Sequence, residues 1–209
     1  MKKTLIMVLV IMLLISGLFI LTGCGNEDNN GKKNDGAEIS YTYGKATYTM
    51  NVPKNEDGTP KFLFTEEKPE KASNSSFYLE TDNAIFSFGT SGLVYNTAKK
   101  YEEKYGKVDA SFDGYIDWVH DSDSGIKLAG WEELEINGRK AVRYYSREGG
   151  SGDYKYYGYN YRISLDDIMP KSALDMNVYY KTDEELKEGK EFDQETLDII
   201  NSLKISLSE

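Results

Sequence analysis

The segment Leu128–Arg147 reads LAGWEELEINGRKAVRYYSR, and it decides the fold. Two runs with strand composition flank Asn137-Gly138, the dipeptide most typical of a two-residue type I′ hairpin turn. The resulting register pairs Ile136 with Arg139, Glu135 with Lys140, Leu134 with Ala141 and Glu132 with Arg143. Two of these pairs join opposite charges directly across the strands, which supports the register. The sequence therefore predicts an antiparallel hairpin here.

Both faces of this hairpin carry apolar side chains. Leu134 and Ile136 lie on one face, and Trp131, Val142 and Tyr144 lie on the other. An antiparallel sheet with one solvated face instead alternates apolar and polar residues. We therefore expect the sheet to be covered on both faces.

Further segments have the patterns of strands and helices. Period-two alternation or a short apolar run predicts strands at Lys45–Val52, Phe62–Phe64, Ser76–Leu79, Ala84–Phe88, Tyr154–Leu165, Leu174–Tyr180 and Ile205–Leu207. Helical spacing predicts one helix over Asn96–Val108 and another that Asp193 caps, with a short helix or strand around Ile116–Val119. This order predicts an α+β fold, an antiparallel sheet flanked by helices in an α/β/α sandwich.

The N-terminus has the order of a secretory signal. Lys2 and Lys3 precede an apolar run over residues 4–20, and Leu21-Thr-Gly-Cys24 closes it. The closing tetrapeptide resembles the lipobox of bacterial lipoproteins. The resemblance implies that residues 1–23 are removed and that Cys24 carries a lipid anchor. The alternative is an uncleaved transmembrane helix, since the run is just long enough to span a bilayer.

Composition divides the rest of the chain into a tether and a domain. Residues 25–38 contain no large apolar side chain, so we expect residues 24–40 to be a flexible tether after the lipidated Cys24. Residues 41–209 suit a single globular α+β domain. Cys24 is the only cysteine, so no intrachain disulfide can form.

The charge of the chain limits its partners. Its formal net charge is −10, whereas nucleic acid and anionic headgroups both select basic surfaces. We therefore expect no nucleic-acid partner. The expected partners are the membrane, through the lipid on Cys24, and an envelope protein or glycan on the extracytoplasmic face of the cell membrane.

No motif for catalysis or metal binding stands out. His120 is the only histidine, and its acidic sequence neighbours favour a solvated surface position over a catalytic triad. The segment that begins with Asp121–Gly125 departs from the calcium-loop pattern at its fifth and sixth positions, Gly125 and Ile126, which favours a polar turn. We expect no enzyme activity, no cofactor and no metal site.

Tyrosine is abundant, with 17 residues, many of them close to the strand Tyr154–Leu165. Tyr157, Tyr159, Tyr161, Ile163 and Leu165 share one face of that strand, and Gly158, Asn160, Arg162 and Ser164 share the other. One reading is ordinary strand composition, with one tyrosine set in the core. The other is a platform for a small ligand or a glycan, for which Trp131, Tyr154 and Tyr156 are the candidates.

The order of elements resembles the Mog1/PsbP-like fold, which occurs in photosystem-associated proteins and many bacterial lipoproteins. Three passages carry the resemblance, namely Val52-Pro53 at a strand end, the hairpin Glu135–Ala141 and the terminal Ile199–Ile205. It spans about residues 41–207. The family supplies no catalytic motif, so the resemblance implies a fold and a non-enzymatic binding or scaffolding role.

Overall fold

The computed structural model describes residues 36–70, 72–93, 111–120, 128–148, 155–181 and 191–208, with the backbone alone at 146–148 and 155–157. The predicted signal segment, Cys24, the helix predicted at Asn96–Val108 and Tyr154 lie outside these residues. The described residues all fall in one unit, Asp35–Glu209. No helix among them is long and apolar enough to cross a membrane.

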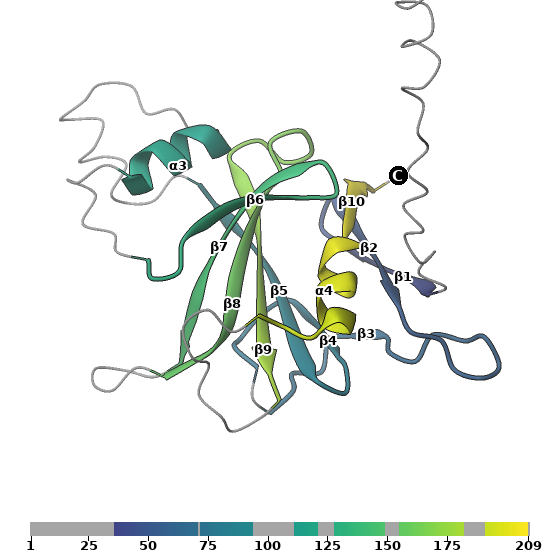
Figure 1. Ribbon diagram of the computed structural model, residues 1–209. Helices are drawn as coiled ribbons and strands as arrows, with labels where there is room; N and C mark the ends of the chain where they lie inside the picture. The colour runs from purple at the N-terminus through teal and green to yellow at the C-terminus, as the bar shows by residue number, and fades with distance from the viewer. Residues whose placement is uncertain are drawn as a thin grey trace, which may run out of the picture. The chain divides into compact units, whose positions relative to one another are not determined.

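Two antiparallel sheets form the framework of the domain (Figure 1). The small sheet has the order β1-β2-β10, built from Ala37–Tyr43, Ala46–Val52 and Lys204–Leu207. The large sheet has the order β3-β4-β5-β9-β8-β7-β6. Its strands are Phe64–Thr65, Phe77–Glu80, Ala84–Gly92, Ser172–Tyr180, Lys155–Ser164, Arg139–Glu148 and Glu132–Ile136, in the same order.

The hairpin predicted from the sequence is confirmed in its register. Strands β6 and β7 pair Glu132 with Arg143 and Glu135 with Lys140. Asn137 and Gly138 have φ angles of 48° and 82°, the positive values that a type I′ turn requires. Local turn chemistry therefore sets the pairing of these two strands.

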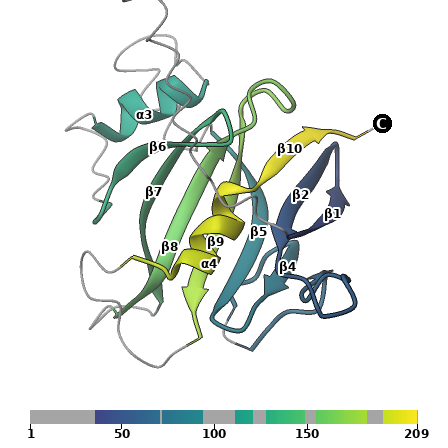
Figure 2. The ribbon, with the colours of Figure 1, turned by 45° about the vertical axis from the view of Figure 1, so that its right-hand side comes forward.

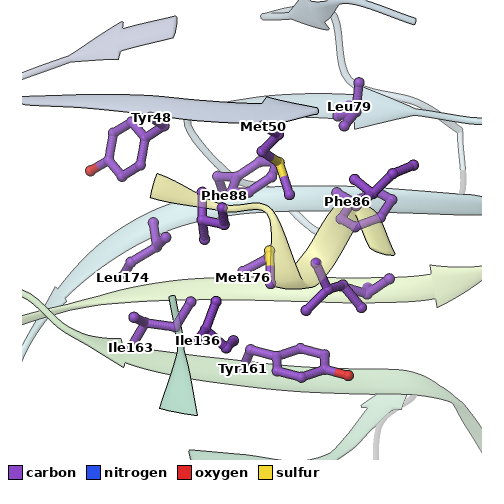
Figure 3. Packing of buried hydrophobic residues seen from close by; sticks show 14 of the residues in the cluster. Tyr48, Met50, Leu79, Phe86, Phe88, Ile136, Tyr161, Ile163, Leu174 and Met176 are labelled. Atoms are coloured by element: carbon purple, nitrogen blue, oxygen red, sulfur yellow. The ribbon is translucent and has the colours of Figure 1, made fainter. Parts of the chain in front are cut away.

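The main core lies between the large sheet and a second layer formed by the small sheet and α4 (Gln194–Asn201). Figure 2 shows α4 lying across the large sheet with the small sheet beside it. In Figure 3, Tyr48 and Met50 of β2 face Phe88 and Met176 of the large sheet. Asp193 caps α4 as predicted, since its carboxylate accepts the Thr196 N–H at 2.9 Å.

The opposite face of the large sheet carries α3 (Phe112–His120), in the region where a short helix or strand was predicted. Phe112 and Tyr115 of α3 pack with Val142 in a separate apolar cluster. The hairpin is thus covered on both faces, as expected.

The fold prediction is confirmed at the level of an antiparallel sheet with helices, but two details differ. Strand β1 begins at Ala37, inside the range assigned to the tether, because Ala37 and Ile39 alternate with polar residues and bury one face. The second detail is the small sheet, whose pairing of β10 with β2 joins distant parts of the chain. Strand patterns alone do not reveal such pairing.

Candidate functional site

A polar hollow of about 650 Å³ opens on the face of the large sheet that also carries α3. Its volume falls in the range of about 300–1,000 Å³ that is usual for small-molecule sites. Strands β5, β9, β8 and β7 supply its floor, and the loop before β4 supplies its rim. The lining residues are Ser73, Asn74, Ser75, Ser76, Gly89, Thr90, Tyr144, Asn160, Arg162, Asp175 and Asn177.

The floor consists of two neighbouring rows that run across the strands. In one row Asn177 pairs with Asn160, and Asn160 pairs with Tyr144. In the other row Gly89 pairs with Asp175, and Asp175 pairs with Arg162. Because side chains alternate along a strand, these residues all project on the face opposite the main core.

The charged centre of the floor is a fixed ion pair. Arg162 donates to Asp175 through Nε at 2.7 Å and Nη2 at 3.1 Å, and Nη2 also donates to Ser91 Oγ at 3.0 Å. The guanidinium lies 4.8 Å from the centre of the Tyr115 ring. Burial alone would lower the pKa of Arg162, but the Asp175 carboxylate more than offsets this, so the pKa is raised and the group stays charged.

Asn160 is the least satisfied polar group of the floor. Its Nδ2 donates to Asn177 Oδ1 at 2.7 Å, and the residue is only 8% exposed. Among the described residues, no donor reaches Asn160 Oδ1. A buried carbonyl oxygen without a donor is unfavourable by about 1–3 kcal/mol. The protein therefore retains at this position a polar atom that destabilises the fold.

Gly89 leaves the floor open above the ion pair. A Cβ added at this residue would meet no atom within 4 Å, and its φ is not positive. Neither backbone strain nor crowding therefore requires glycine in the middle of β5. A glycine inside a strand often marks a place where a ligand or another chain approaches closely.

The rim of the hollow is anchored to the sheet. Ser73 Oγ lies 3.1 Å from Ser87 Oγ, which is fully buried beneath it. Tyr78 Oη accepts the Ser75 N–H at 2.9 Å and donates to the Ser75 carbonyl at 3.1 Å. These bonds hold the loop in position, so the hollow exists without a ligand.

An aromatic pair borders the hollow on the β7 side. Tyr144 lines the hollow, and its ring stacks on that of Trp131 with centroids 6.2 Å apart and an interplanar angle of 8°. Trp131 also packs against the α3 cluster. Of the three residues predicted as a platform, Trp131 is thus next to the hollow. Tyr154 lies outside the described residues, and only the backbone of Tyr156 is described.

The other predicted tyrosine set lies in the core. Tyr159 and Tyr161 are each 2% exposed and belong to the main apolar cluster. The reading that one set is ordinary core composition is therefore confirmed. The face that carries these two residues packs against α4 and the small sheet, whose residues belong to the same cluster.

His120 has the surface position that its neighbours predicted. Its Nε2 lies 3.0 Å from Glu133 Oε1, and both side chains are more than half exposed. Its ring also packs edge-on against Trp131, with the two ring centroids 5.5 Å apart. The segment Asp121–Gly125 lies outside the described residues. Within the described part of the chain, no group of three or more His, Cys, Asp or Glu residues could hold a metal ion.

A second hollow, of about 390 Å³, lies beside the hairpin turn. Arg139, one of the cations that line it, is held by Asp167 and by the carbonyls of Ser164 and Ile205. These bonds connect β7, the loop after β8 and β10. The arrangement is that of a structural clamp between the two sheets, and we take the hollow over Gly89 as the candidate site.

The sequence identified the polar face of β8 but not the site. It placed Gly158, Asn160, Arg162 and Ser164 together, whereas the partners Asp175 and Asn177 require the register between β8 and β9. The alternation of polar and apolar residues in Leu174–Tyr180 is the signal that could have found them.

Comparisons with protein-family models, curated proteins and solved structures give no match to this chain.

Proposed function

We propose that this chain is a lipoprotein anchored through Cys24 on the extracytoplasmic face of the cell membrane. Its domain binds a component of the envelope and catalyses no reaction. The lipobox-like Leu21–Cys24 supports the anchor, and the acidic composition argues against direct docking on anionic lipid. We further propose the α/β/α sandwich of the Mog1/PsbP-like fold, which α3 and α4 support by packing on opposite faces of the large sheet.

The observation that carries the binding role is the gap at Gly89 over the Arg162–Asp175 pair. A stable sheet face would cover this pair with a side chain from β5, and the backbone permits one. The polar groups beneath the gap are already oriented by their bonds to each other. Such preorganisation favours binding, because little ordering is needed when a ligand arrives.

The small-ligand or glycan alternative remains a proposal, with a different site. Its platform residues Trp131, Tyr154 and Tyr156 were chosen for their aromatic rings, whereas the hollow is mainly polar. Trp131 contributes to the hollow only indirectly, by stacking on Tyr144.

Two experiments test the proposed function. Cys24→Ala should move the protein from the membrane fraction to the soluble fraction, whereas an unchanged membrane-bound protein would support the uncleaved helix. Capture from intact envelopes with the wild-type chain should recover a component that Gly89→Gln, which places a side chain in the hollow, does not recover. Equal recovery by both proteins would contradict a binding role for the hollow.

A further inference from the structure

The two charged groups of the hollow are exposed to different extents. Among the described residues that line it, only Arg162 and Asp175 are charged. The Arg162 side chain is 8% exposed, and the Tyr115 ring of α3 lies 4.8 Å from its guanidinium carbon. The Asp175 side chain is 20% exposed. The positive half of the pair is therefore covered from α3, and the negative half is the one that a ligand can reach.

The Asp175 carboxylate has room for another donor. Its Oδ1 accepts from Arg162 Nε at 2.7 Å, and its Oδ2 accepts from Arg162 Nη2 at 3.1 Å. A carboxylate has about four acceptor positions on its two oxygens, so these bonds use about half of them. The protein already contains one charge bonded to two opposite charges, because Arg143 donates to both Glu132 and Glu191. Asp175 can hold a second cation in the same way.

The space beside Asp175 is the gap at Gly89. The two residues are direct partners across β5 and β9, and a Cβ added at Gly89 would meet no atom within 4 Å. The loop before β4 lies on the other side of β5, where the Ser76 N–H donates to the Phe88 carbonyl at 2.8 Å. Serine hydroxyls of this loop line the hollow and can accept hydrogen bonds. A group over Gly89 therefore lies between a carboxylate and a row of hydroxyls.

These surroundings favour a small cation that donates hydrogen bonds. A primary ammonium has three N–H donors and no acceptor, so it can bond to a carboxylate and to hydroxyls at once. A quaternary ammonium has no such donor and binds best against aromatic rings, whereas Tyr144 is the one aromatic residue among the described lining. An anion would meet Asp175 first. The net charge of −10 also favours the approach of cations.

We propose that the hollow over Gly89 binds a primary ammonium group at the end of an alkyl chain, with the ammonium donating to the Asp175 carboxylate. This inference rests on the proposed binding function and names the ligand chemistry of the same site. Lysine side chains and free alkyl amines share this chemistry. Arg162 is a positioning residue, because its two bonds hold the carboxylate in place.

Titration of the isotopically labelled full-length chain in detergent micelles, followed by NMR, tests the proposal. The probes are Nα-acetyl-lysine amide, butylamine, Nα-acetyl-glutamine amide and Nα-acetyl-glutamate amide. We expect the lysine derivative or butylamine to shift the backbone amide signals of Gly89 and Asp175, with saturation in the millimolar range, and the glutamine and glutamate derivatives to leave them unchanged. Preference for the lysine derivative would indicate a lysine side chain as the source, and preference for butylamine a free amine. Added salt should weaken the binding.

Two substitutions locate the bound ammonium. Gly89→Gln places a side chain in the gap and should weaken binding about tenfold or more. Ser206→Gln adds the same side chain at an exposed position of β10 and should bind as the wild type does. The double variant Arg162→Met/Asp175→Leu removes the carboxylate together with its partner and should abolish binding. Thermal unfolding monitors the fold of each variant.

Gly89→Lys tests the same carboxylate without a ligand. The new side chain lies directly across from Asp175, so its ammonium can take the place of the ligand. We expect the thermal midpoint of Gly89→Lys to exceed those of Gly89→Gln and Gly89→Glu, by a margin that shrinks as salt is added. Equal midpoints of the three variants would show that Asp175 accepts no second cation and would overturn the proposal.

Three titration results would also overturn it. They are no shift with either amine, equal shifts with the glutamine derivative, and amine binding that Gly89→Gln leaves unchanged. The capture experiment separates this failure from failure of the proposed function. If recovery from envelopes still depends on an open Gly89 while neither amine binds, the hollow is a binding site for another class of ligand.

Discussion

The two faces of the large sheet are built from alternate residues of the same strands, yet they carry different chemistry. On the face toward α4, Phe86, Phe88 and Met176 are fully buried in one continuous apolar cluster. On the other face, apolar clusters occupy two regions, and the polar floor of the hollow has Arg162 and Asn160 at its centre. The first face accounts for stability. The second contains groups that stability alone does not explain.

Neighbouring residues of β5 give the sharpest form of this comparison. Phe86→Ala empties a site in the main core and should lower the free energy of unfolding by about 3–5 kcal/mol. Ser87→Ala, on the other face, loses one hydrogen bond to Ser73 and should lower it by about 1 kcal/mol. Denaturant unfolding measures both. If the two variants lost the same free energy of unfolding, the two faces would contribute equally to stability and the contrast between them would be wrong.

Variants of the ion pair show whether Arg162 and Asp175 stabilise the fold or whether each charge only offsets the cost of burying the other. Arg162→Met leaves Asp175 in the floor without its partner and should lower the free energy of unfolding by about 3 kcal/mol. The double variant Arg162→Met/Asp175→Leu removes both charges and should recover most of that loss. If the double variant is as unstable as the single one, the pair is needed for folding.

Alkaline pH should lower the free energy of unfolding through two tyrosines that are buried in the main core. Burial raises the pKa of Tyr48 and of Tyr161 to about 12, from the ordinary tyrosine value of 10.0. Above pH 10 the unfolded state loses these protons while the folded state keeps them. The stabilisation is therefore complete below pH 10 and is lost between about pH 10 and pH 12.

Unfolding measured as a function of pH, together with tyrosinate absorbance, checks this prediction. Tyr48→Phe should reduce the alkaline loss of stability, because a phenylalanine side chain has no proton to lose in the unfolded state. If the stability of Tyr48→Phe depended on pH as that of the wild type does, Tyr48 would not contribute to the alkaline loss of stability.

Gly89→Ala should give the smallest effect, and one of opposite sign. Its added Cβ has free space, and alanine loses less conformational freedom on folding, so the free energy of unfolding should rise by about 0.5–1 kcal/mol. A loss of stability, measured by denaturant unfolding, would mean that glycine is required by the strand itself. In that case the gap would carry no functional meaning.

The sequence predicted local features well and distant pairing poorly. Asn137-Gly138 and its charge pairs determined the register of β6 and β7, and Asp193 identified the start of α4, because both signals lie within a few residues. The small sheet could not be predicted in this way. Its central strand β2 pairs with β10 from the far end of the chain, a choice made by packing.

The candidate site shows the same limit. Asn160 and Arg162 were recognised as sharing one face of a strand, but not as a site. Their partners, Asn177 and Asp175, lie on the neighbouring strand β9, and the register between the strands brings them together. The meaning of Gly89 depends on empty space above it, which no sequence pattern records. The prediction instead relied on the aromatic residues Trp131, Tyr154 and Tyr156, of which the structure places Trp131 beside the hollow.

The central claim is that the polar floor is kept for binding at the expense of stability. The free energy of unfolding of Asn160→Val/Asn177→Val tests it most directly. This variant replaces the paired amides by side chains that suit a strand and removes the unpartnered oxygen. We predict a free energy of unfolding equal to or above that of the wild type. A loss of several kcal/mol would contradict the claim and show that the polar rows hold the sheet together.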